Sequence, residues 1–398
     1  MNEPIYFTEE HRQFRDNLRR YIDQEIVPRA APWEDAGMVP RAVMRQMGEL
    51  GYLGIRYPEA YGGSGLDTVY SAILAEELGR STYGGYAVTV TVHTDMASPH
   101  LANFGTPEQL QRYLPSLIRG ETVCAVAVTE PDAGSDVAGI RTRAVRDGDH
   151  WVINGSKMFI TNGVHGDLYF VGAKTDPTAK GSRGISIFIV EKGTPGFRVG
   201  RALKKSGWLC SDTAELVFEN CRIPAANLLG GENKGFYQIM RNFQNERMVI
   251  GAQAMGEAAR AIEMTVDYVR ERKAFGATLW DKQAIRQRLA MRAAQVEAAR
   301  ALVHQTAWRD AQVEAGRALV YHAAWLDAQG KDCVKEVSMV KALCGELVNE
   351  VLYDCQQFHG GFGYMHETTI ARMVRDARVE AIGGGATEVM LEEVAKRM

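Results

Sequence analysis

The sequence lacks the features of several specialised classes of protein. A formal net charge of -3 over 398 residues gives no electrostatic sign of nucleic-acid binding. No apolar run reaches the length of a membrane span, and no basic stretch followed by an apolar core opens the chain, so we expect neither a membrane span nor secretion. Cysteine pairs with CxxC spacing and histidines at ligand spacing are also missing, which predicts no metal site. The six cysteines, which we expect to be reduced thiols, mostly buried, in a cytoplasmic protein, are Cys124, Cys210, Cys221, Cys333, Cys344 and Cys355.

The composition that remains is that of an ordinary globular protein. Hydrophobic residues make up 46% of the chain and charged residues 24%, and the length suggests two or three domains. Changes in pattern along the chain place the boundaries near residues 122 and 230. We therefore predict domains over residues 1–122, 123–230 and 231–398.

Residues 1–122 carry the signals of helices. Thr8, Asp67 and Thr106 each stand where a side chain can cap the first turn of a helix, and Pro40 suits the first position of another. We expect an all-α amino-terminal domain.

Residues 123–230 change to short runs of β-branched and aromatic residues. Asn154 and Gly155 lie between two such runs and form the dipeptide favoured in tight hairpins, so a hairpin is predicted there. The run 185–190 predicts a further strand. This segment is expected to be a small β domain.

Residues 231–398 return to helical spacing. A stripe of apolar residues follows Gly235, a long helix is predicted after Gln283, and another over residues 334–353. Helices, then strands, then helices predict an α+β fold with a carboxy-terminal helical bundle.

One loop has the composition of a ligand site. Residues 129–136 (TEPDAGSD) follow an apolar run that predicts a buried strand, and they offer the hydroxyls of Thr129 and Ser135 beside the flexible Gly134. Backbone N–H groups in such a loop suit an anionic or heteroaromatic ligand. Taken alone, an ordinary acidic turn explains these residues equally well.

Glu246 is the most informative single residue. On the helix predicted after Gly235, it shares a face with Ile239, Phe243 and Ile250. A carboxyl in apolar surroundings has a raised pKa, which suits it to take a proton near neutral pH. A structural ion pair with Arg247 or another cation is the alternative, and helix geometry alone favours that alternative.

Five segments together resemble the acyl-CoA dehydrogenase family, in the family's order and over essentially the whole chain. The resemblance implies an α+β fold with an amino-terminal helical domain, a middle β-barrel-like domain and a carboxy-terminal four-helix bundle, assembled as a homotetramer with FAD. The segments are residues 128–136 (VTEPDAGSD), 157–163 (KMFITNG), 271–276 (ERKAFG), 357–364 (QFHGGFGY) and 375–378 (RDAR).

The resemblance also assigns cofactor contacts. Thr129 and Thr161 would hydrogen-bond the flavin ring, and Phe159 would lie against its face. Arg272, which would pair with the pyrophosphate, belongs to a segment that reaches the FAD of a neighbouring subunit, although a solvated charge at a helix end is the alternative. The other matching positions are Val126, Gly134, Ser135, Ile160, Phe275, Gln283, Gln357, Gly360, Gly361, Ala386, Thr387 and Glu388, where Ala386 replaces a usual threonine.

The family reaction is α,β-dehydrogenation of an acyl-CoA thioester to the trans-2-enoyl-CoA. A carboxylate removes the α-proton, hydride passes to flavin N5, and electrons leave to an electron-transfer flavoprotein. Many members carry the base near the carboxy end, where this chain has Gly384 in IGGGAT. Members that resemble the long-chain and isovaleryl types carry it in a Glu-Arg pair on an earlier helix, which Glu246 and Arg247 match, so Glu246 becomes the expected base. Gly384 would still offer its N–H to the thioester carbonyl.

The substrate positions follow from the same resemblance. The acyl group is expected to be a medium or long straight chain, with branched or terpenoid groups as alternatives. An acyl-CoA oxidase, a flavin monooxygenase on the same fold and a non-catalytic flavin-binding relative stay open as other readings. The matching CoA contacts are Ser135, Ser182, Arg183, Tyr237, Gln244, Arg247 and Gly384, of which Arg183 could instead be solvated.

Overall fold

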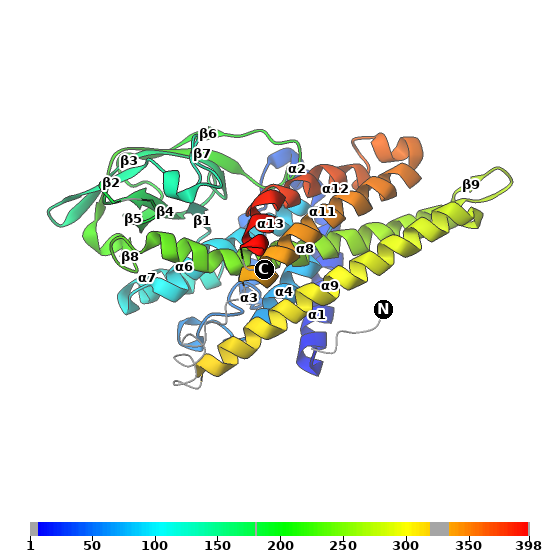
Figure 1. Cartoon of the computed structure of the whole chain (residues 1–398), viewed down its shortest axis with the longest axis horizontal. Helices are drawn as coiled ribbons and strands as arrows, with labels where there is room; N and C mark the ends of the chain where they lie inside the picture. The colour runs from blue at the N-terminus through cyan, green and yellow to red at the C-terminus, as the bar shows by residue number, and fades with distance from the viewer. Residues whose placement is uncertain (1–6, 180, 319–333, 397–398) are drawn as a thin grey trace.

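The amino-terminal part of the protein is helical, as predicted. The computed structural model describes residues 7–179, 181–318 and 334–396. Along the chain, helices come first, a sheet follows, and further helices come last (Figure 1). The first helices are α1 (Glu9–Tyr21), α2 (Ala31–Ala36), α3 (Arg41–Glu49), α4 (Thr68–Arg80), α5 (Gly84–Thr91), α6 (Ser98–Phe104) and α7 (Pro107–Ile118), with two π-helical turns, η1 (Ile22–Ile26) and η4 (Val92–Ala97).

Local side-chain chemistry sets the starts of these helices. Thr8, Asp67 and Thr106 each accept a backbone N–H of the first turn, which satisfies a donor that has no partner within the helix. Pro40 differs slightly from its predicted place. Its ψ of 139° is extended, so it stands just ahead of α3 rather than at the first helical position.

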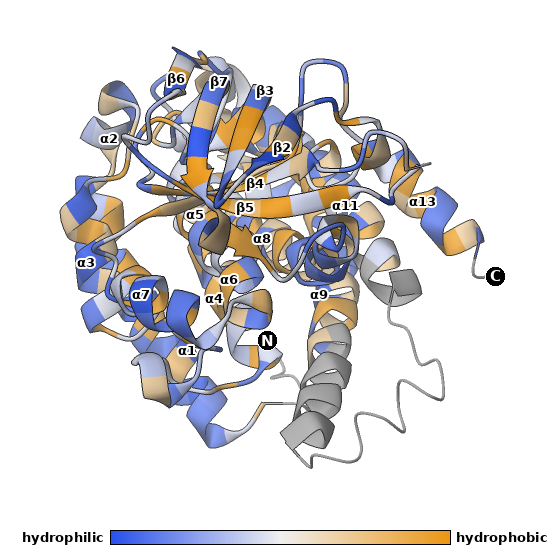
Figure 2. Ribbon diagram, turned by 90° about the vertical axis from the view of Figure 1, so that its left-hand side faces the viewer, coloured by the Kyte–Doolittle hydropathy of each residue, from blue (hydrophilic) through white to orange (hydrophobic). Residues whose placement is uncertain are grey.

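The middle part is an eight-stranded sheet. Its neighbouring strands run in the order β6-β7-β3-β2-β4-β5-β8, and β1 pairs with β4 in parallel. The inner strands β4 and β5 are almost wholly buried, and β5 is hydrophobic along much of its length in Figure 2. The strands are β1 (Cys124–Ala127), β2 (Arg143–Asp147), β3 (His150–Thr161), β4 (Leu168–Lys174), β5 (Ile185–Glu191), β6 (Phe197–Ala202), β7 (Thr213–Pro224) and β8 (Leu228–Leu229).

The prediction of a hairpin at Asn154 and Gly155 is wrong. Strand β3 continues through both residues, and the turn that joins it to β2 consists of Gly148 and Asp149, between the paired residues Asp147 and His150. Gly155 has a φ of 147° and lies so close to Thr142 that a Cβ would clash with it. The glycine therefore serves a β-bulge and a close approach between strands, not a turn.

The carboxy-terminal part is again helical, and its helices pack on α4 of the amino-terminal part. No helix among the described residues combines the length and apolar character that crossing a membrane requires. Five of the cysteines are free and buried, and Cys333 lies outside the described residues. The elements are α8 (Gly235–Glu271), β9 (Lys273–Ala274), β10 (Ala277–Thr278), α9 (Gln283–Ala318), α11 (Val334–Phe358), α12 (Thr369–Ala377) and α13 (Thr387–Ala395).

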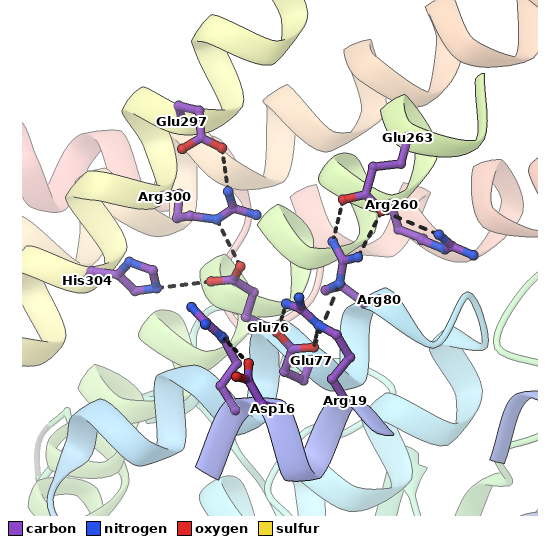
Figure 3. A network of polar contacts seen from close by, with 11 residues as sticks. Asp16, Arg19, Glu76, Glu77, Arg80, Arg260, Glu263, Glu297, Arg300 and His304 are labelled. Carbon is purple, nitrogen blue, oxygen red and sulfur yellow. Dashed lines mark hydrogen bonds and ion pairs between the residues drawn. The ribbon is translucent and has the colours of Figure 1, made fainter. Parts of the chain in front are cut away.

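A buried network of charges joins the first and last parts of the chain (Figure 3). Glu77 on α4 accepts two hydrogen bonds from Arg19 on α1, and Glu76 pairs with Arg300 at 2.9 Å and with His304 at 3.0 Å, both on α9. Removing one partner of a buried ion pair costs about 3–5 kcal/mol, because the other charge is left unpaired. The network therefore fixes how α4 sits against α1 and α9.

Candidate active site

The loop after β1 is braced against β3 by a buried lysine. Thr129 O accepts the N–H of Met158 at 2.9 Å, and Lys157 Nζ donates to Val128 O and to Glu130 Oε1, both at 2.8 Å. Sequence reasoning missed the roles of Lys157 and Glu130. The signal was present, because Lys157 stands at the inward-facing parity of β3, where only a paired charge is tolerated.

This brace keeps the loop rigid. Burial lowers the pKa of Lys157 to about 8, and Glu130 opposes that change. Burial would raise the pKa of Glu130, but Lys157 and the N–H groups of Arg141 and Thr142 hold it below its ordinary value. A carboxylate so satisfied holds the loop in one conformation.

The surface that the loop presents fits a planar heteroaromatic group. Phe159 has a φ of 62° at a second bulge of β3, and its ring is left 67% exposed. Thr161, at the end of β3, and Thr129, in the loop after β1, are half-buried nearby, and nothing lies within 4 Å of the position of a Cβ on Gly134. A strained, exposed aromatic residue next to hydroxyl groups is a typical ligand platform. Of the remaining predicted residues here, Ile160 is buried, Val126 is half-buried and Ser135 is exposed.

Glu246 is buried on α8, with 6% of its surface exposed. Burial raises its pKa to about 7, while a hydrogen bond from Asn242 and the positive charge of Arg247 act in the opposite direction. The Asn242 amide lies 2.9 Å from Glu246 Oε1 and is neutral. A carboxyl with this pKa can both take and release a proton near neutral pH.

The loop that carries Gly384 lies against the same face of α8. Gly384 has a φ of 63°, and a Cβ there would overlap Ile250 Cδ1, one turn after Glu246. The structure thus brings Glu246 and Gly384 to one region although they are far apart in sequence. Ala386 precedes α13 without capping it, and Thr387 already donates its hydroxyl to Glu346 at 2.8 Å. Glu388 is exposed.

A second group of predicted residues lies far from Glu246. Arg272 follows the end of α8, 26 residues after Glu246, which at 1.5 Å per residue is roughly 40 Å along the helix. Phe275 is 95% exposed at the tip of the β9–β10 hairpin, which projects from the molecule in Figure 1. A stack of Tyr268 on His359, with ring centroids 4.4 Å apart, joins this end of α8 to the end of α11. The other members of the group are Gln283, Gln357, Gly360 and Gly361, which are also exposed.

The predicted CoA residues fall near the start of α8. Asn233 is bonded to Thr175 and Ser186, so the loop between β4 and β5, which carries Ser182 and Arg183, is tied to the residues ahead of this helix. On α8 itself, Tyr237 is exposed and Gln244 half-buried, whereas Arg247 is buried with its guanidinium over the Phe243 ring.

Comparison with known proteins identifies the class to which this fold and site belong. The sequence patterns of the acyl-CoA dehydrogenase N-terminal, middle and C-terminal domains match residues 8–121, 125–221, and 233–312 with 309–398. The chain therefore belongs to the acyl-CoA dehydrogenase family, whose members are oxidoreductases, and the resemblance and the α+β fold predicted from the sequence are confirmed.

Several individual relatives cover nearly the whole chain. The long-chain specific acyl-CoA dehydrogenase of Sus scrofa is 41% identical over 393 residues, which are 98% of this chain and 87% of that protein. The isovaleryl-CoA dehydrogenase of Pongo abelii is 35% identical over 96% of this chain and 87% of its own length. The crystal structure of acyl-CoA dehydrogenase from Geobacillus kaustophilus superposes with a TM-score of 0.90 at 41% identity and covers 99% of both chains.

Proposed function

We propose that this protein catalyses the α,β-dehydrogenation of an acyl-CoA thioester to the trans-2-enoyl-CoA, with FAD as cofactor and Glu246 as base. The burial of Glu246 on α8, opposite the loop of Gly384, is the observation that carries the proposal. Since Gly384 has no side chain to take a proton, Glu246 is the carboxyl assigned to that task.

The residues at the end of β1 and in β3 would hold the flavin. Thr129 and Thr161 offer hydroxyls, Phe159 offers an exposed ring, and the Lys157 brace keeps them in place before the cofactor arrives. FAD supplies the hydride acceptor when it is bound. Half-buried hydroxyls beside an exposed aromatic fit its isoalloxazine ring better than they fit a simple anion.

Glu246 would remove the α-proton of the substrate. An α C–H group is a far weaker acid than a carboxylic acid, so the thioester carbonyl must be polarised while negative charge develops. The N–H of Gly384 is proposed to supply one such hydrogen bond. A pKa of about 7 leaves a large fraction of Glu246 ionised at neutral pH, ready to accept the proton.

The CoA part is assigned to the entrance formed by the β4–β5 loop and the start of α8. Its proposed contacts are Ser135, Ser182, Arg183, Tyr237, Gln244 and Arg247. Relatives named for long-chain and isovaleryl substrates support an acyl group of medium or greater length or one with a branch.

The exposed group at the far end of α8 is proposed to complete the FAD site of another subunit. Arg272 lies roughly 40 Å along α8 from Glu246, and the hairpin that carries Phe275 projects on the side of the molecule away from the sheet (Figure 1), so we assign both residues to a site shared within a homotetramer or a smaller assembly with the same contact. An electron-transfer flavoprotein is the proposed electron acceptor, the compartment is proposed to be the cytoplasm, and the domain boundaries near residues 122 and 230 stay predictions.

Anaerobic reduction of the flavin by a panel of straight and branched acyl-CoA thioesters tests the proposal. Glu246→Gln should fold, retain its yellow flavin and bind palmitoyl-CoA, yet bleach about 100- to 10,000-fold more slowly, as expected when a general base is removed. Glu257→Gln is a matched control, because Glu257 is another buried glutamate of α8 with a raised pKa. Unchanged bleaching in Glu246→Gln would exclude Glu246 as the base, and rapid reoxidation in air would indicate an oxidase.

A further inference from the structure

Asn242 lies one turn before Glu246 on α8 and is buried, with 4% of its surface exposed. Its side-chain amide nitrogen donates to Glu246 Oε1 and to Met96 O, both at 2.9 Å, with a longer contact of 3.4 Å to Asp95 O. An amide nitrogen carries two hydrogens. One therefore serves the carbonyls of η4, and the other points at the carboxyl of Glu246.

The backbone of η4 fixes which way this amide faces. Met96 O and Asp95 O can only accept hydrogen bonds, so the opposite orientation of the amide would place its oxygen against two carbonyl oxygens. The orientation of Asn242 is thus set by groups outside the catalytic region. The N–H that Asn242 donates to Glu246 Oε1 therefore points in a direction fixed by η4 and not by Glu246.

Both carbonyls belong to η4, which is a π-helical turn. A π-turn changes the pattern of backbone hydrogen bonds, and such turns are frequent at functional sites. A second asparagine of α8, Asn245, also serves this turn: its amide donates to Asp95 O at 3.0 Å and to Asp95 Oδ1 at 3.1 Å. Of these two asparagines, Asn242 is the one that donates to Glu246.

We propose that Asn242 is a positioning residue for the base, holding Glu246 Oε1 as a hydrogen-bond acceptor so that Oε2 receives the α-proton. This inference rests on the proposed role of Glu246 in the reaction. Because the N–H of Asn242 lowers the basicity of Oε1, Oε2 is the more basic oxygen and takes the proton. The carboxyl is also held in one rotation, which favours a near-attack geometry.

The same hydrogen bond tunes the acidity of the base. An N–H donor stabilises the ionised carboxylate, and it acts against the burial that raises the pKa of Glu246. Removing the donor leaves burial opposed mainly by Arg247, so the pKa should rise further. The charged groups around this neighbourhood are Arg247 on α8, Asp95 on η4 with Arg56 near it, and Lys341 on α11, which lies within the field of Arg247.

Asn242→Leu tests the inference, since leucine has a similar size and no N–H. The rate of anaerobic flavin bleaching by palmitoyl-CoA should fall about 10- to 100-fold near pH 7, because a hydrogen bond to a charged group is lost. The acidic limb of the plot of bleaching rate against pH should move to higher pH by about one unit. Asn242→Asp, which places a second carboxyl beside Glu246, should move it at least as far and keeps the test available if the leucine variant does not fold.

Asn245→Leu is the matched control. It makes the same chemical change on the same helix and removes two bonds to η4 and the one that Asn245 accepts from Arg56, but none to Glu246. It should lower the melting temperature and leave the acidic limb in place. If the limb moves equally in Asn245→Leu, Asn242 acts only by docking η4, and the inference is wrong.

Infrared difference spectra supply a readout that does not depend on turnover. Subtracting the spectrum of Glu246→Gln isolates the protonated carboxyl of Glu246 from those of Glu257 and Glu380, which are also buried with raised pKa values. Asn242→Leu should retain this band to higher pH. An unchanged band and limb, together with an inactive Glu246→Gln, would overturn the role of Asn242 while keeping the proposed base; a fully active Glu246→Gln would overturn both.

Discussion

Replacing Glu246 by glutamine is expected to stabilise the folded protein at alkaline pH, although it removes the proposed base. Burial raises the pKa of Glu246 from its ordinary 4.5 to about 7. At about 1.4 kcal/mol per unit of pKa, ionising Glu246 in the folded protein costs about 3–4 kcal/mol more than in the unfolded chain. Glutamine carries no charge and can still accept the hydrogen bond of Asn242, so it avoids this cost.

The sign of the effect follows from proton binding. Between pH 4.5 and about 7 the folded protein holds a proton on Glu246 that the unfolded chain has lost, so the parent loses stability as the pH rises through this window. Below the window both states are protonated and the variant has little advantage. Above it the advantage of Glu246→Gln is complete.

Thermal unfolding of the FAD-loaded parent and variant, at about pH 5 and about pH 8.5, measures this difference. Melting temperatures are compared rather than free energies of unfolding because proteins of several domains do not generally unfold in two states. Glu9→Gln, which changes an exposed glutamate on α1, is the control and should show no such pH dependence. An equal difference between parent and Glu246→Gln at both pH values would refute the assignment of a raised pKa.

Two further substitutions test the proposed cofactor site. Arg272→Ala should lose FAD during gel filtration, which the ratio of flavin to protein absorbance measures. Lys273→Ala removes the same charge from the next exposed position and should retain FAD. Equal retention in the two variants would contradict the shared site. Lys157→Met should lower the melting temperature, because it leaves Glu130 buried without its cation, which costs about 3–5 kcal/mol. Lys157→Met with Glu130→Gln should recover part of that loss, which a purely steric effect would not allow.

Local signals predicted much of the fold. The caps at Thr8, Asp67 and Thr106 were found because a side chain and the N–H that it accepts lie within three residues of each other. The hairpin at Asn154 and Gly155 failed for the opposite reason. The turn preference of that dipeptide is local, whereas the approach of Gly155 to Thr142 comes from strand pairing and overrides it.

The candidate site shows the same division. The burial of Glu246 could be predicted because its apolar neighbours lie on its own helix at helical spacing, whereas its proposed role as base came from the resemblance to the family. The role of Asn242 could not be predicted, because its orientation depends on a hydrogen bond to the carbonyl of Met96, 146 residues away in the chain. Lys157 likewise pairs with residues 27 and 29 positions earlier. The periodicity of apolar residues predicts which face of a helix or strand is buried, but not which polar group of a distant segment packs against that face.

The contact between Gly384 and Ile250 offers a test of how the carboxy-terminal loop supports the base. Gly384→Ala meets two obstacles: a φ of 63°, and overlap of the new Cβ with Ile250 Cδ1, one turn from Glu246. Gly37→Ala meets only the first, because Gly37 has a φ of 69° and nothing lies within 4 Å of its Cβ position. Both variants should lose about 1 kcal/mol of stability to backbone strain.

The difference between the two variants isolates the overlap. Gly384→Ala should slow flavin bleaching strongly with little loss of FAD, because a shift of Ile250 or of the loop disturbs the region around Glu246, and Gly37→Ala should not slow it. Ile250→Val removes the Cδ1 atom that the alanine meets, so Gly384→Ala with Ile250→Val should regain much of the rate. A double variant as slow as Gly384→Ala alone would mean that the loop acts on catalysis by another route than its contact with α8.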